Sequence, residues 1–121
     1  MIELYNGDCR AFLPNYSGER FDAVITDPPY ASGGATLSER SASTSQKYTA
    51  TKKACPFPDF MGDQMDSRSW LHMMANVFAL ARVQCHDGAV LVVFCDWRQI
   101  PLLTDAVQWA GWQWRGTLVW D

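Results

Sequence analysis

The apolar residues of this chain fall into runs with two different periods. Residues 23–27 run through Val24, Ile25 and Thr26 to a carboxylate, and residues 89–95 form a continuous apolar run. Both runs favour strands, and the second is typical of a central parallel strand that is covered on both faces. Between them, apolar residues recur at three- and four-residue spacing and predict an amphipathic helix from Asp66 or Ser67 to about Cys85. The residues of its apolar stripe are Trp70, Leu71, Met74, Val77, Phe78 and Ala81.

Shorter patterns predict the remaining elements. These are a strand over 2–5, a short helix over 9–13, a helix over 100–110 and a last strand over 112–120. Gly88 suits the left-handed end of the long helix, and Gly111 ends the helix before the last strand. This order predicts an α/β fold with a mostly parallel, Rossmann-like sheet and flanking helices, incomplete at about four strands and three helices.

Residues 31–65 break this regular pattern. The segment is rich in Ser and Thr, shows almost no apolar periodicity and predicts a long mobile loop. It is also basic within an acidic protein, with Arg40, Lys47, Lys52 and Lys53 against Glu39. Two interpretations stay open: a solvated loop, or a segment that becomes ordered on a nucleic-acid backbone.

Composition narrows the class of protein. The chain has 121 residues, 48% of them hydrophobic and 19% charged, and a net charge of −3, so it predicts one small globular domain without a global attraction for nucleic acid. No signal peptide or apolar membrane span is visible, and a soluble cytoplasmic protein is expected. The four cysteines form no C-x-x-C pair. Cys85 and His86 with Cys95 could form a metal site, but the pattern favours small apolar side chains that fill the core, and no metal is expected.

The sequence Asp27-Pro28-Pro29-Tyr30 carries the most distinctive chemistry. Neither proline can donate to a sheet ladder, so the strand is expected to end with Asp27 at its carboxyl edge, where open α/β sheets bind ligands. A carboxylate and a backbone carbonyl are both acceptors, and together they suit an exocyclic amino group with two protons to donate. Tyr30 offers a flat face for stacking a base. The alternative is a common Asp-Pro turn with an exposed tyrosine.

The Asp27–Tyr30 sequence resembles motif IV, (D/N/S)-P-P-(Y/F/W), of the DNA amino-methyltransferases. The upstream Asn6-Gly7-Asp8-Cys9, followed by Phe21 and the strand into Asp27, is similar to the opening of the permuted, β-type members of that family. The resemblance implies methyl transfer from S-adenosylmethionine to a flipped-out base in DNA, at adenine N6 in preference to cytosine N4.

The resemblance also assigns roles to residues. Asp27 and the Pro28 carbonyl would accept from the target amino group within the catalytic set Asp27, Pro28, Pro29 and Tyr30, and Tyr30 would stack on the base. The cofactor-binding set would be Asp8, Cys9 and Asp27, with the Asp8 carboxylate on the adenine amino group of S-adenosylmethionine. Asp8 is also a good helix N-cap, and the two roles are compatible.

The family's cofactor glycine loop and target-recognition region have no counterpart in residues 1–121. We therefore expect residues 1–121 to be a partial catalytic domain that is inactive alone. It would be an N-terminal fragment, half of a split enzyme or a truncated product. Its expected partners are DNA and either a second copy in a homodimer or a complementing C-terminal half. Methylation of RNA or of a protein amide, and an inactive DNA-binding or assembly remnant, are the alternative functions.

Overall fold

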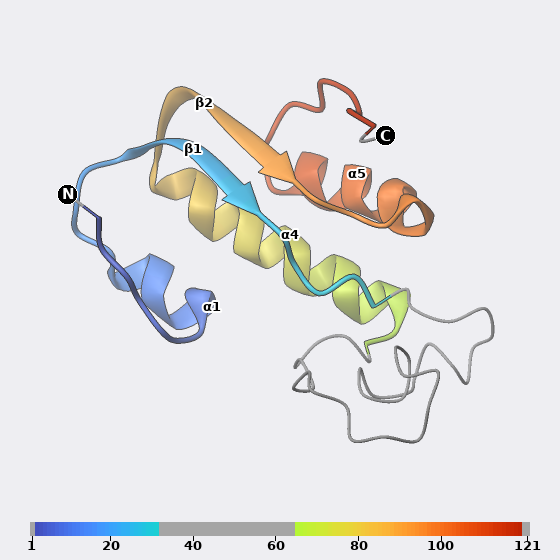
Figure 1. Ribbon diagram of the computed structural model, residues 1–121, viewed down its shortest axis with the longest axis horizontal. Coiled ribbons are helices and arrows are strands. Elements are labelled where there is room, and N and C mark those ends of the chain that lie inside the picture. Colours follow the sequence, from blue (N-terminus) through green and yellow to red (C-terminus); the bar gives the residue numbers. More distant parts are fainter. Residues whose placement is uncertain (1, 32–64, 120–121) are drawn as a thin grey trace.

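A computed structural model describes residues 2–31 and 65–119 of the chain (Figure 1). The elements are helix α1 (Cys9–Phe12), 3-10 helix η1 (Leu13–Asn15), strand β1 (Phe21–Thr26), helix α4 (Ser67–Val83), strand β2 (Cys85–Val93), 3-10 helix η2 (Trp97–Gln99) and helix α5 (Ile100–Trp109). The described part is thus a small α/β structure with three α-helices. Residues 32–64, which hold most of the predicted loop over 31–65 and all its charged side chains, lie outside it.

β1 and β2 form a parallel two-stranded sheet. Ala23 pairs with Val90 and Thr26 with Val93, and the Phe94 amide continues the ladder by donating to the Thr26 carbonyl at 2.9 Å. Parallel strands bring their carboxyl ends to the same edge, so the segments after Thr26 and Val93 leave the sheet side by side. The prediction that the first strand ends at Asp27, at the carboxyl edge of a parallel sheet, is thus confirmed.

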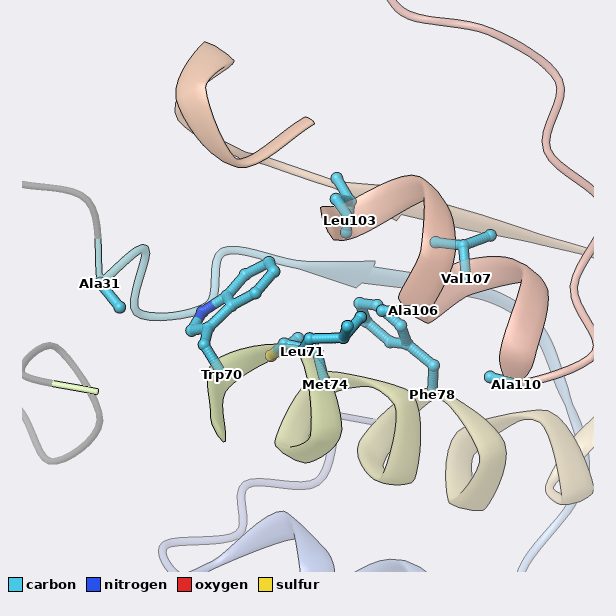
Figure 2. Close-up of a cluster of buried hydrophobic side chains, with 9 residues drawn as sticks. All are labelled: Ala31, Trp70, Leu71, Met74, Phe78, Leu103, Ala106, Val107 and Ala110. Carbon is cyan, nitrogen blue, oxygen red and sulfur yellow. The ribbon is translucent and has the colours of Figure 1, made fainter. Parts of the chain in front are cut away.

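The core lies between α4, α5 and one face of the sheet. Trp70, Met74 and Phe78 of α4 meet α5 across a buried cluster, and Leu91 and Val93 of β2 pack against it. Figure 2 shows the side chains of Trp70 and Phe78 extending from α4 toward α5 and the strands. Of the predicted stripe, five residues are buried and Val77 is half-buried, so the helix period identified the correct face.

The other face of the sheet is open, which corrects the prediction that residues 89–95 are covered on both faces. Ile25 of β1 is 70% exposed, and Val90, Val92 and Phe94 of the β2 segment are 56%, 40% and 53% exposed. Both helices that pack on the sheet lie on its inner face, and no described element covers the outer one. The sheet therefore presents an apolar surface of four side chains.

The strands predicted over 2–5 and 112–120 do not appear among the described residues, so the predicted four-stranded, Rossmann-like sheet is not confirmed. Residues 2–5 and 112–119 have no strand partner there, and a strand without a neighbour leaves its backbone groups unpaired. Ile2, Leu4 and Leu118 are at least 90% exposed. Trp112 instead folds back onto α4, where its indole N–H donates to the Phe78 carbonyl at 3.0 Å.

The end of α4 also differs from the prediction. The helix ends at Val83 with Gln84 as its C-cap, and Cys85 already belongs to β2. Gly88 does have a positive φ of 87°, but it lies within β2, where the pairing shifts from Phe21–Cys85 to Ala23–Val90. Its conformational freedom serves an irregularity in the strand rather than a helix end.

The predicted helix starts are confirmed. Asp66 accepts hydrogen bonds from the amides of Arg68 and Ser69 at the start of α4, and Asp8 caps α1 in the same way. Within residues 2–31 and 65–119, no helix is long and apolar enough to cross a membrane.

Candidate active-site corner at the carboxyl edge of the sheet

Asp27–Tyr30 leaves the carboxyl edge of the sheet directly after β1, as predicted. Asp27 is exposed, whereas Pro28, Pro29 and Tyr30 are half-buried. Asp96, which follows β2, lies at the same edge and caps η2 by accepting from the Arg98 amide at 2.9 Å. Asp27–Tyr30, together with Asp96, is called the Asp27 corner below. Its two carboxylates come from segments that are distant in sequence.

Two buried side chains hold the backbone of the corner in place. The indole N–H of Trp70 donates to the Pro29 carbonyl at 2.5 Å, and the Gln99 side-chain amide donates to the Tyr30 carbonyl at 2.9 Å. Trp70 is 0% exposed and Gln99 is 3% exposed. Figure 2 shows the Trp70 indole beside the segment that ends at Ala31.

Ala31 closes the corner in a strained conformation. Its φ is +51°, in the left-handed region, where a residue with a Cβ costs on the order of 1 kcal/mol or more. The side chain is 4% exposed and belongs to the buried cluster with Trp70. Packing against the core therefore holds a turn that the local backbone does not favour.

The corner keeps hydrogen-bond acceptors available. The Tyr30 hydroxyl donates to Oδ1 of Asp27, which uses one of roughly four acceptor positions on a carboxylate. Among the described residues, nothing donates to Oδ2 of Asp27 or to the Pro28 carbonyl. A carboxylate oxygen and a backbone carbonyl next to it in sequence are thus open to a donor group from outside.

The corner also favours the neutral form of Tyr30. Burial, followed by the hydrogen bond to Asp27 and the negative charge of that carboxylate, raises the pKa of Tyr30 to about 12. Cys95 and Asp96 act in the same direction, which places them within electrostatic range of the Tyr30 hydroxyl. Burial likewise raises the pKa of the Cys95 thiol to about 11. Both groups are therefore neutral at neutral pH, and the protonated Tyr30 hydroxyl can donate to Asp27.

Asp8 and Cys9 lie on a different part of the molecule. Both are exposed at the start of α1, and η1, which follows α1, is joined to the end of α4 by a 2.8 Å hydrogen bond from Gln84 to the Leu13 carbonyl. Arg10 binds both oxygens of Asp8, and these hydrogen bonds lower the pKa of Asp8 to about 2. No hydrogen bond, ion pair or ring contact among the described residues joins Asp8 or Cys9 to Asp27. The four predicted catalytic residues are consecutive in the chain and lie at this corner, whereas the role of Asp8 and Cys9 in binding a cofactor stays a prediction.

Two of the three described cysteines lie wholly or partly in the interior, whereas Cys9 is exposed. Cys85 is buried and its thiol donates to the Ala81 carbonyl at 3.2 Å, and Cys95 is half-buried. No group of three His, Cys, Asp or Glu side chains in residues 2–31 and 65–119 is arranged to hold a metal ion.

Sequence reasoning missed Trp70 and Gln99 as residues of the site. Trp70 was assigned only to the apolar stripe of α4, although an indole buried in a core needs an acceptor for its N–H, and that need was a usable signal. Gln99 gave no signal, because a single glutamine before a helix is ordinary. Comparisons with protein-family models, with curated proteins and with solved structures give no match.

Proposed function

We propose that the Asp27 corner is the target-binding half of a DNA amino-methyltransferase site, which holds the exocyclic amino group of a flipped-out adenine. One proton of the amino group would go to Oδ2 of Asp27 and the other to the Pro28 carbonyl. Two acceptors placed out of the ring plane would turn the nitrogen lone pair away from the aromatic system. The methyl group would come from S-adenosylmethionine, the donor that the resemblance implies.

The observation that carries this proposal is the selective use of acceptors at the corner. The carbonyls of Pro29 and Tyr30 accept from buried donors, while no residue of the described part donates to Oδ2 of Asp27 or to the Pro28 carbonyl. Holding acceptors toward solvent on a rigid backbone suits a ligand that brings donors. An ordinary Asp-Pro turn requires neither buried donors such as Trp70 and Gln99 nor a strained residue such as Ala31.

Asp8, the expected partner of the adenine ring of S-adenosylmethionine, binds Arg10 with both oxygens. A carboxylate has roughly four acceptor positions, so Asp8 keeps room for that amino group, but no contact among the described residues places this site beside Asp27. No step of the reaction is therefore assigned to residues that hold the donor. The part of the reaction that this chain supports is capture and orientation of the amino group, with adenine preferred over cytosine as in the resemblance.

The test is a titration of the whole chain with adenosine and with purine riboside, which differs by lacking the amino group. Chemical shifts of the labelled protein would report binding. We expect adenosine to bind about tenfold or more tightly, since two hydrogen bonds to a carboxylate and a carbonyl are at stake. Asp27→Ala should remove this preference. Equal affinity of the wild-type chain for both nucleosides contradicts the proposal, and a stronger preference for cytidine would move it to cytosine.

A further inference from the structure

We propose that Trp70 and Gln99 are positioning residues that select which backbone carbonyl of the corner meets the substrate. This inference rests on the proposed function and deepens it. Three consecutive residues, Pro28, Pro29 and Tyr30, each carry a carbonyl. The two side chains turn the second and third of these toward buried donors, whereas no described residue donates to the first.

The side chains of Trp70 and Gln99, called the clamps below, come from two different elements. Trp70 lies in the first turn of α4, and Gln99 is the last residue of η2, which follows β2. Trp70 joins the corner to α4, and Gln99 joins it to the segment that follows β2. Since both donors are almost fully buried, each hydrogen bond is protected from water and resists rotation of the peptide groups it holds.

This arrangement fixes direction as well as position. The strained Ala31 directly follows Tyr30, and a left-handed residue at that point would relax if the carbonyls before it were released. Rotation of the Pro29 or Tyr30 peptide group would bring a second carbonyl into competition for the amino group. The clamps therefore keep the Pro29 and Tyr30 carbonyls directed into the interior and leave the Pro28 carbonyl as the one that no described residue binds. Neither clamp contacts the substrate in this account.

Gln99 gives the sharper test, because Gln99→Glu keeps size and shape. As a carboxylate it cannot donate to the Tyr30 carbonyl, and as a carboxylic acid it can. We expect the preference for adenosine over purine riboside to fall about two- to tenfold in Gln99→Glu at pH 8 and to recover as the pH is lowered. Gln99→Met should lose the preference at every pH. Trp70→Phe, which retains an aromatic ring without the donor, should lose it similarly.

Carbonyl ¹³C shifts of Pro29 and Tyr30 provide a readout that needs no ligand. Gln99→Met should shift the Tyr30 carbonyl, and Trp70→Phe the Pro29 carbonyl, in the direction of a lost hydrogen bond. If the wild-type chain prefers adenosine and Gln99→Met keeps that preference, the positioning role is wrong while the proposed function stands. If the wild-type chain shows no preference, the proposed function fails, and unchanged carbonyl shifts in both variants would refute the clamps as well.

Discussion

The hydrogen bond from Trp70 to the Pro29 carbonyl links the folded core to the corner, and its contribution to stability can be isolated. Replacing Trp70 by benzothienylalanine exchanges the indole N–H for sulfur and preserves the bicyclic shape. Because Trp70 is fully buried and Pro29 is half-buried, the loss corresponds to a hydrogen bond whose acceptor regains part of its hydration. We expect the free energy of unfolding to fall by about 1 kcal/mol, roughly a fivefold change in the equilibrium constant. Trp70→Phe also removes packing atoms and should cost about 2–3 kcal/mol.

Urea unfolding followed by circular dichroism measures this difference. For a domain of this size the slope is about 1–3 kcal/mol/M, so the midpoint should drop by roughly 0.3–1 M without a change of slope. Trp109 is 70% exposed, and the same benzothienylalanine exchange there should leave the midpoint unchanged. A midpoint at Trp70 within about 0.1 M of wild type would show that the indole N–H does not hold the corner, and the reasoning would fail.

Two further predictions test the sheet and the tyrosine. Ile25→Thr on the open face of the sheet should change the free energy of unfolding by no more than about 0.5 kcal/mol. Phe78→Ala in the core should lower it by about 3–5 kcal/mol. A loss above about 1.5 kcal/mol for Ile25→Thr would mean that the open face is covered. Tyr30→Phe should be less stable than wild type by about 1 kcal/mol below pH 10. Because folding raises the Tyr30 pKa from 10.0 to about 12, this difference should shrink as the pH rises from 10 through 12. A difference that stays constant across that range would contradict the donor role of Tyr30.

The sequence predicted those features of the fold that depend on residues close together in the chain. Two consecutive prolines after Asp27 can neither pair in a ladder nor extend the strand, so the end of β1 followed from the sequence. The stripe through Trp70 and Phe78 identified the buried face of α4, and Asp66 identified its start. Each of these depends on residues within a few positions of one another.

Features that depend on a distant neighbour were not predictable in this way. The apolar run of β2 is compatible with cover on two faces, but the pattern of a strand does not establish that an element exists to cover the second face. Residues 2–5 have strand character and no strand partner among the described residues. The contact between Trp70 and Pro29 spans 41 positions, and nothing in the helix period announces it. The clamp of the corner is therefore a property of tertiary structure.

The most direct measurement follows the amino group itself. Adenosine labelled with ¹⁵N at its exocyclic amino group is titrated with the wild-type chain and with Asp27→Ala, and the amino ¹⁵N and proton shifts are recorded. Our account predicts that both amino protons move downfield on binding to the wild-type chain, one toward Asp27 and one toward the Pro28 carbonyl, and that Asp27→Ala abolishes the movement of one of them. Amino resonances that do not change with the wild-type chain would contradict the assignment of this corner as an amino-group site.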